Sequence, residues 1–502
     1  MRPTPAMMRS PPGRRHKLDG IMVNRLSPDE AMFYFLDGSG TTAHLGAVLI
    51  LDPSKLPKGD ATTVDYHSLV SLVENRLQLA PRYRQVVTEV TLGLGRPVWV
   101  DDREFDINYH IRLSALPQPG SADQLQELVS RLMSRPLDRT RPLWEMYLIE
   151  GLSRGRAVIL TKTHRCLLGG ADNPELSEVI CDDVADAEPM AEDLWMPGHP
   201  PGAASLTVGA LAEAMARPGE VVDSVLRGNG PVADLWSVAD KSVRFVSDAV
   251  SQMVNSAPDS PLNTVTTSSR LFAFSSVSRR DLEAVARRFE CSFNDVVLAI
   301  LTGVLRRWSL SVKDSVGHGE TMRATMPLAA RDPETVEGEP TGTWIVVGGT
   351  EFVTDLPVGE DAPAVRLMQV AGLADRYSQS TRRMTRGLRP LLPEIGLVPF
   401  ADFSTRAFAG LFQRSYNVPI SMSARRIGRK FVGGMPITGI FTIPTLAAQR
   451  ALGISVNEYA NQVQFSFIAD RAVVVDLPAM SQYVTESLDE LLAGGQSFGR
   501  DH

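Results

Sequence analysis

The pattern of apolar and polar residues is most informative near position 160, where an apolar run ends in charged residues. Residues 157–160 are Ala, Val, Ile and Leu, and the run closes at His164 and Arg165, shortly before two glycines. A run rich in Val and Ile is typical of a buried strand, and paired glycines permit a sharp turn. Apolar residues alternate through residues 141–152, which predicts a partner strand. A polar pair at the end of a buried strand is a candidate for chemistry.

Other elements are marked by helix starts and by further apolar runs. Two capping boxes are expected, at Ser27 with Glu30 and at Ser121 with Gln124, because a Ser and an acidic or amide residue stand three positions apart. Apolar runs at residues 44–51 and 271–274 predict strands. The spacing of apolar residues predicts a longer helix that begins at Ser292 and extends through Trp308.

Seven prolines between residues 190 and 262 interrupt the apolar pattern and divide the chain. We expect a crossover linker here, in which residues 242–254 form an amphipathic helix. Packing of this helix on its own protein is favoured over membrane contact. The predicted division is a disordered leader at 1–20, an N-terminal domain at 21–190, the linker with amphipathic helices at 191–265 and a C-terminal domain at 266–495.

Composition narrows the class of protein. A chain of 502 residues with 43% hydrophobic residues can bury the cores of two or three domains. The net charge of −7 and the lack of an extended Lys/Arg face argue against nucleic acid as a partner. The three cysteines lack the spacing of a metal site and favour a reducing compartment. No apolar run approaches the roughly 18 residues of a membrane span, and no secretory signal is evident, so we predict a cytoplasmic protein.

Two motifs around the buried strand have a recognisable order. Pro142-Leu143-Trp144 precedes the strand, and residues 164–170, H-R-C-L-L-G-G, follow it. This pair resembles the P-L-W and H-H-x-x-x-D-G motifs of the bacterial wax ester synthase/diacylglycerol acyltransferase family. In the second motif Arg165 stands where the family has its second histidine, and Gly169 stands where it has aspartate, while Gly170 is kept.

The resemblance continues into the second half of the chain. Asn294 and Asp295 begin a segment similar to the family's N-D-V-V-L-A motif, and Asn417 lies in one similar to N-V-P-G-P. The resemblance implies two chloramphenicol-acetyltransferase-like α/β domains with mixed β-sheets, a tunnel between them and a segment that crosses from one to the other. It also implies acyl transfer from fatty acyl-CoA to diacylglycerol or a long-chain alcohol, which gives triacylglycerol or wax ester.

In the family, the second histidine takes the proton of the alcohol and the aspartate holds the loop. Arg165 cannot inherit the role of the base, because deprotonating a guanidinium at neutral pH costs about 7 kcal/mol, at about 1.36 kcal/mol per pKa unit. General base catalysis contributes about 10²–10⁴-fold to a rate. The degenerate motif therefore predicts an impaired or non-catalytic member, a pseudoenzyme that binds lipid or acyl-CoA or regulates a partner. An active O-acyltransferase with a different base is the alternative.

His164 is the first candidate for such a base, but neighbours on a strand face opposite sides, so a structural, hydrogen-bonding histidine is favoured. Cys166 is favoured as a buried apolar residue over a nucleophile. Asn294 and Asp295 are favoured as capping and domain-packing residues, and Trp144 as a core residue. Pro142, Leu143, Gly170 and Asn417 are read as substrate-binding or structural. A condensation-type domain acting on carrier-bound acyl groups fits the motifs less well.

The resemblance also implies the ligands. We expect no bound cofactor and no metal, with fatty acyl-CoA as co-substrate and diacylglycerol or a long-chain alcohol as acceptor. Peripheral contact with a membrane or lipid droplet, and pairing with an active paralogue or as a homodimer, are open alternatives for the partners.

Overall fold

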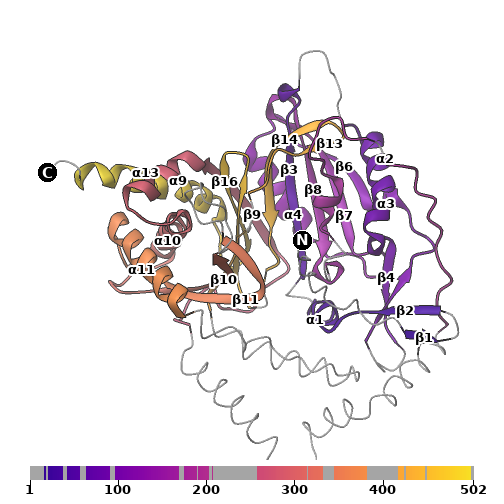
Figure 1. Ribbon diagram of the computed structural model, residues 1–502, viewed down its shortest axis with the longest axis horizontal. Helices are drawn as coiled ribbons and strands as arrows, with labels where there is room; N and C mark the ends of the chain where they lie inside the picture. Colours follow the sequence, from indigo (N-terminus) through magenta and orange to yellow (C-terminus); the bar gives the residue numbers. More distant parts are fainter. Residues whose placement is uncertain are drawn as a thin grey trace, which may run out of the picture.

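A computed structural model gives the fold of the chain (Figure 1). It describes residues 16–18, 21–37, 42–56, 64–90, 96–168, 174–188, 190–202, 206, 257–313, 315–331, 344–380, 416–422, 426–446 and 449–498. The predicted helix at 242–254 and the motif glycines Gly169 and Gly170 lie outside these residues.

The N-terminal domain is built on a mixed six-stranded sheet. Its strand order is β13 (Phe431–Val432), β14 (Met435–Ile443), β3 (His44–Leu51), β8 (Arg156–His164), β7 (Trp144–Leu152) and β6 (Ile111–Ala115). Only β6 and β7 are parallel, and the other neighbours are antiparallel. The strands predicted at 44–51 and around 157–164 are confirmed.

The C-terminal domain has a second mixed six-stranded sheet. Its order is β11 (Trp344–Leu356), β10 (Met322–Arg331), β12 (Val418–Met422), β15 (Leu452–Tyr459), β16 (Gln462–Asp470) and β9 (Arg270–Ser278). One face of this sheet is covered by α9 (Arg279–Arg288), α10 (Phe293–Val312), α11 (Pro363–Ser380) and α13 (Leu477–Phe498) (Figure 1). The predicted α/β class with two mixed-sheet domains is therefore correct.

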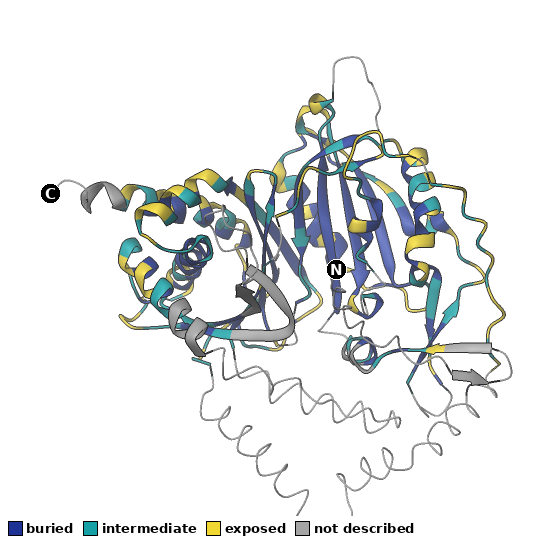
Figure 2. Ribbon diagram, in the orientation of Figure 1, coloured by how far each residue is buried: buried dark blue, intermediate teal, exposed yellow. Residues whose placement is uncertain are grey.

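The two sheets meet around one helix. On the N-terminal sheet, α2 (Tyr66–Arg76), α3 (Ile107–His110) and α5 (Leu176–Ile180) pack on one side with α1 (Pro28–Leu36), and α4 (Ala122–Ser134) packs on the other. A single apolar cluster joins α4 to both sheets, for example through Leu160 of β8 and Phe272 of β9. The strands at this boundary are buried (Figure 2).

Residues 431–443 cross from the C-terminal half of the chain into the N-terminal sheet, and the sequence pattern did not indicate this crossing. The predicted C-terminal domain included residues 431–443, but β13 and β14 belong to the N-terminal sheet, where β14 runs antiparallel to β3. The segment predicted as a disordered leader, residues 1–20, also contains a strand. Its residues His16–Leu18 form strand β1, which pairs with β2 (Ile21–Arg25) in a four-stranded sheet with β5 (Val98–Asp101) and β4 (Gln85–Thr88).

The capping predictions hold in atomic detail. Full capping boxes begin α1 at Ser27, α4 at Ser121 and α10 at Ser292.

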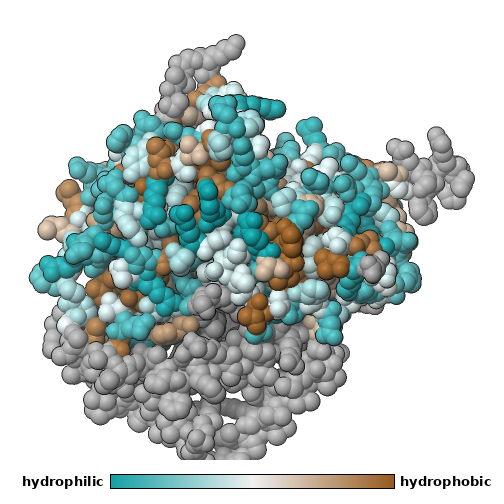
Figure 3. Space-filling model, turned by 180° about the vertical axis from the view of Figure 1, so that it is seen from behind, coloured by the Kyte–Doolittle hydropathy of each residue, from teal (hydrophilic) through white to brown (hydrophobic). Residues whose placement is uncertain are grey.

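Hydrophilic and hydrophobic side chains are mixed on the face seen from behind (Figure 3). Within the described segments, no helix combines the length and the apolar character needed to span a bilayer.

Candidate active site

The candidate site lies where β8 ends and β3 begins. His164, the last residue of β8, stands directly opposite His44, the first residue of β3, and their ring centroids are 6.1 Å apart. Alternation along β8 puts residue 164 on the face that carries Val158 and Leu160, and these two residues pack toward α4 and the C-terminal sheet. The motif histidine therefore faces the boundary between the domains.

One ring nitrogen of His164 is hydrogen-bonded, and the other faces a carboxylate. Its Nδ1 accepts a hydrogen bond from the backbone N–H of Cys166 at 3.1 Å, so the proton of the neutral ring is assigned to Nε2. Nε2 lies 3.3 Å from Oδ2 of Asp37, which is an ion-pair distance, although the angle is outside hydrogen-bond geometry. His164 is 1% exposed, and its side chain caps the start of the turn that follows.

Asp37 is the residue that ends α1, and it is itself anchored. Its Oδ1 accepts from the N–H of Ala43 at 3.3 Å, and its carbonyl accepts from Nη2 of Arg139 at 2.8 Å. Burial alone would raise the pKa of Asp37, but its interactions with His164, and then with His44 and Arg139, outweigh burial and lower it. The carboxylate is therefore ionised at neutral pH.

Arg165 is exposed, whereas His164 is buried. It begins the 3₁₀ turn η6 (Arg165–Leu167), its backbone N–H donates to the carbonyl of Ala43 at 2.7 Å, and its side chain is exposed. The guanidinium carbon lies 5.4 Å from the ring centroid of Phe33 in α1, within the range of a cation–π contact. Because β8 ends at His164 and Arg165 already belongs to the turn, the difference in burial between them does not come from strand alternation.

Cys166 is a buried thiol without the environment of a nucleophile. It is 0% exposed and belongs to the apolar cluster under α1 and α2. Burial, with smaller contributions from the negative charges of Glu30 and Asp37, raises the pKa of its thiol. Because the thiolate is the reactive form, this cysteine is unreactive at neutral pH.

Several polar residues of the site escaped sequence reasoning. His44 is 2% exposed and neither ring nitrogen has a hydrogen-bond partner, and burial, followed by the charge of Lys162, lowers its pKa well below the ordinary value. Lys162 is fully buried, donates from Nζ to the carbonyl of Leu132 at 3.0 Å and lies 3.8 Å from Glu145. Burial lowers the pKa of Lys162 to about 8. The signal available in the sequence was the polar side chain at alternate positions of an otherwise apolar strand.

The P-L-W motif is part of the core rather than of this polar cluster. Pro142 and Leu143 are buried, and Trp144 is 0% exposed. The indole Nε1 of Trp144 donates to the carbonyl of Tyr83 at 2.7 Å, and its ring stacks on His110 at 4.5 Å between centroids. The expectation of a core tryptophan is therefore consistent with its surroundings.

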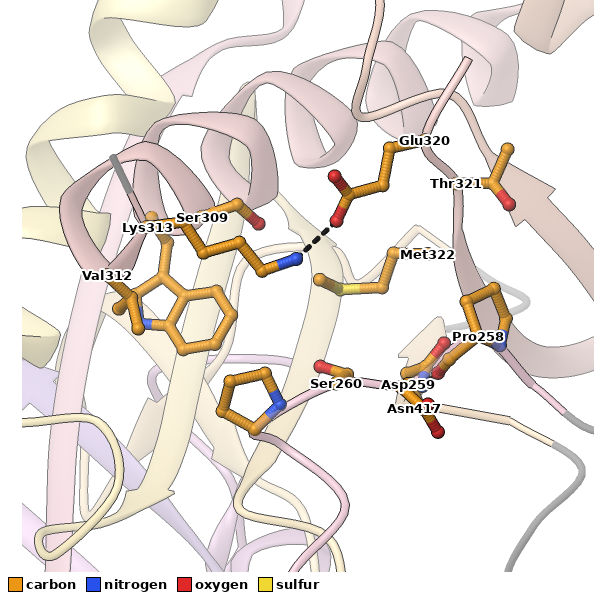
Figure 4. Close-up of a pocket in the computed structure, with 12 residues that line it drawn as sticks. Pro258, Asp259, Ser260, Ser309, Val312, Lys313, Glu320, Thr321, Met322 and Asn417 are labelled. Carbon is orange, nitrogen blue, oxygen red and sulfur yellow. Dashed lines mark hydrogen bonds and ion pairs between the residues drawn. The ribbon is translucent and has the colours of Figure 1, made fainter. Parts of the chain in front are cut away.

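The C-terminal motif residues serve local structure. Asp295 is buried, and its carboxylate accepts from the N–H of Ser292 at 2.8 Å in the capping box of α10, while Asn294 is half-buried beside it. Asn417 is fully buried and lies at a different pocket, beside Trp308 and Met322. In that pocket Lys313 reaches toward Glu320 and forms an ion pair (Figure 4). The structure thus does not bring Asn417 into the cluster around His164.

Comparison with known proteins gives the same family as these motifs. The family model for the wax ester synthase/diacylglycerol acyltransferase catalytic domain matches residues 26–297, and that for the WS/DGAT C-terminal domain matches residues 351–492. The probable diacylglycerol O-acyltransferase tgs3 of Mycobacterium tuberculosis is 41% identical over 271 residues, which is 54% of this chain and 98% of the relative. The probable diacylglycerol O-acyltransferase tgs2 of the same species is 25% identical over 477 residues, 93% of this chain and 99% of the relative.

A solved structure shares the fold. The wax ester synthase/diacylglycerol acyltransferase from Marinobacter aquaeolei VT8 superimposes with a TM-score of 0.66 at 22% identity, covering 94% of this chain and 100% of that one. The fold and the motif order define a two-domain protein of the acyltransferase type. The chain belongs to the wax ester synthase/diacylglycerol acyltransferase family.

Proposed function

We propose that this chain binds a fatty acyl-CoA and a lipid hydroxyl acceptor, diacylglycerol or a long-chain alcohol, and has lost the family's standard base-catalysed transfer. Family membership supports the substrate class, because the relatives are named for acyl transfer to diacylglycerol and for wax ester synthesis. The observation that carries the loss of catalysis is Arg165, an exposed guanidinium at the position of the motif's second histidine.

The missing step is a proton transfer. In acyl transfer to an alcohol, the oxygen attacks the thioester carbonyl, its proton passes to a base, and the thiolate of CoA leaves and is protonated. A guanidinium cannot accept that proton at neutral pH. Without general base catalysis the rate should fall by about 10²–10⁴-fold.

His164 and Cys166 are poorly suited to replace the base. His164 has its one lone pair on Nδ1, where the N–H of Cys166 occupies it, and its Nε2 faces Asp37. The thiol of Cys166 is buried and its pKa is raised. These contacts support an impaired or non-catalytic protein that binds lipid and acyl-CoA or regulates an active relative.

One observation favours a second candidate function, an O-acyltransferase with a different base. Glu175 caps α5 without making a side-chain capping bond, and its buried Oε1 has no hydrogen-bond partner. Burial and the charge of Glu178 raise the pKa of Glu175 to about 7, while Ser177 and Arg165 act in the opposite direction. A carboxyl group that titrates near neutral pH suits a general base. This candidate predicts that Glu175→Gln abolishes transfer.

The experiment compares binding and turnover in the same preparation. Palmitoyl-CoA binding is measured by titration calorimetry, and transfer of labelled palmitoyl groups is measured with diolein and with hexadecanol as acceptors. The native chain should bind palmitoyl-CoA and transfer at least about 100-fold more slowly than Arg165→His combined with Gly169→Asp. A native chain that binds no palmitoyl-CoA, or that transfers as fast as the double variant, contradicts the proposal.

A further inference from the structure

We infer that Asp37 is a positioning residue that holds the motif turn through His164, so that the turn is formed without a carboxylate at position 169. The inference deepens the proposed function and rests on it, because it explains how a binding site with a degenerate motif keeps its shape. Asp37 contacts His164 and acts through it.

Two successive contacts connect the end of α1 to the turn. The carboxylate of Asp37 lies 3.3 Å from Nε2 of His164, and Nδ1 of His164 accepts the N–H of Cys166 at 3.1 Å. Cys166 immediately follows residue 165, and that N–H is the one that the side chain of His164 caps at the start of η6. The carboxylate therefore fixes the imidazole, and the imidazole fixes the backbone that presents residue 165.

Arg139 holds the end of α1 that carries the Asp37 carboxylate. Nη2 of Arg139 donates to the backbone carbonyls of Tyr34 at 3.0 Å and of Asp37 at 2.8 Å, and the guanidinium carbon lies 4.7 Å from the ring centroid of Tyr34. The side chains of Asp37 and His164 are 14% and 1% exposed. At so buried a site water screens the contact between this carboxylate and the imidazole less than it would screen a contact on the surface.

The backbone of Ala43, just before β3, supports the same turn. The N–H of Arg165 donates to the carbonyl of Ala43 at 2.7 Å, and the N–H of Ala43 donates to Oδ1 of Asp37 at 3.3 Å. The chain just before β3 thus joins the carboxylate to residue 165 by a route separate from the imidazole. Both routes start at Asp37 and reach the backbone of residues 165 and 166.

The consequence is a prediction about which change restores a base. If the turn is already held by Asp37, Arg165→His alone should place an imidazole in the productive position, and Gly169→Asp should add little. A misplaced catalytic group costs up to about 100-fold in rate, so loss of the support should be measurable in kcat.

The experiment compares R165H, R165H/G169D and R165H/D37N for transfer from palmitoyl-CoA to diolein. We expect R165H to reach a kcat within about threefold of R165H/G169D, and R165H/D37N to lose about 10- to 100-fold in kcat with KM nearly unchanged. R165H/D65N is the matched control, because Asp65 is an exposed carboxylate at the start of α2, where Asn also caps well. Thermal unfolding checks that each variant is folded, and R165H/D37E should recover part of the loss.

The failures are distinguishable. Activity in R165H/G169D with none in R165H overturns the inference and leaves the proposed function standing. Inactivity of all variants contradicts the proposed function, and the inference is then decided by amide hydrogen exchange of the native chain. Asp37→Asn should accelerate exchange in the peptide containing Cys166 at least about tenfold, and unchanged exchange there overturns the inference.

Discussion

Asn417 offers the sharpest test of how the C-terminal motif residues act, because its side chain is fully buried and closely surrounded by polar atoms. Its Oδ1 accepts from the N–H of Arg323 at 2.8 Å. Its Nδ2 donates to the carbonyl of Pro258 at 2.8 Å and to Oδ1 of Asn263 at 2.7 Å. The side chain therefore links residues 258–263 to the start of β10.

The change Asn417→Ala removes three hydrogen bonds and leaves their partners in a buried place. At about 1 kcal/mol for each bond, the free energy of unfolding should fall by about 3 kcal/mol, and by more if the orphaned groups stay dry. Asn417→Asp should be no milder, because a carboxylate oxygen would then face the carbonyl of Pro258. Both variants should lose stability without any change in the residues around His164.

The assay is urea unfolding followed by tryptophan fluorescence, which reports on this region because Trp308 lines the same pocket as Asn417. Asn108→Ala is the matched control, since Asn108 is exposed and should cost less than about 0.5 kcal/mol. A loss for Asn417→Ala equal to that of the control refutes a structural role and returns Asn417 to the substrate-binding reading.

Three further predictions follow from single contacts. A Cβ at Gly46 would lie 2.0 Å from the carbonyl oxygen of Thr161, so Gly46→Ala should destabilise the fold by about 3 kcal/mol or more, measured as a lower urea midpoint. Burial lowers the pKa of Lys162 to about 8, and the folded chain then releases a proton that the unfolded chain keeps up to pH about 10.4. The native chain should therefore gain stability relative to Lys162→Met between pH 8 and 10, by at most about 1.4 kcal/mol per pH unit, and a falling difference contradicts this. In the folded chain Cys166 should stay unmodified by iodoacetamide in peptide mapping, and labelling as fast as that of the half-buried Cys291 would show that its burial is wrong.

Local features of the fold were predictable because they depend on neighbours in sequence. Capping boxes need only residues three positions apart, and Ser27, Ser121 and Ser292 all form them. For the same reason the apolar runs at β3 and β8 marked buried strands.

Long-range pairing was not predictable in this way. Nothing in the pattern of residues 435–443 says that they join β3 rather than a strand of their own half, since both sheets offer apolar partners. The approach of Asp37 to His164 follows from where α1 packs against the turn after β8, a tertiary contact without a local signal. The buried Lys162 is tolerated because backbone carbonyls at the end of α4 accept hydrogen bonds from its Nζ, which a single sequence does not reveal.

We claim above all that a guanidinium at position 165 prevents the proton transfer while the chain still binds its substrates. The most direct measurement is a single turnover, with the native chain in excess over labelled palmitoyl-CoA at saturating diolein. We predict that the label stays bound as the CoA thioester while R165H/G169D converts it to triacylglycerol at least about 100-fold faster. Conversion by the native chain at the rate of the double variant would contradict the claim.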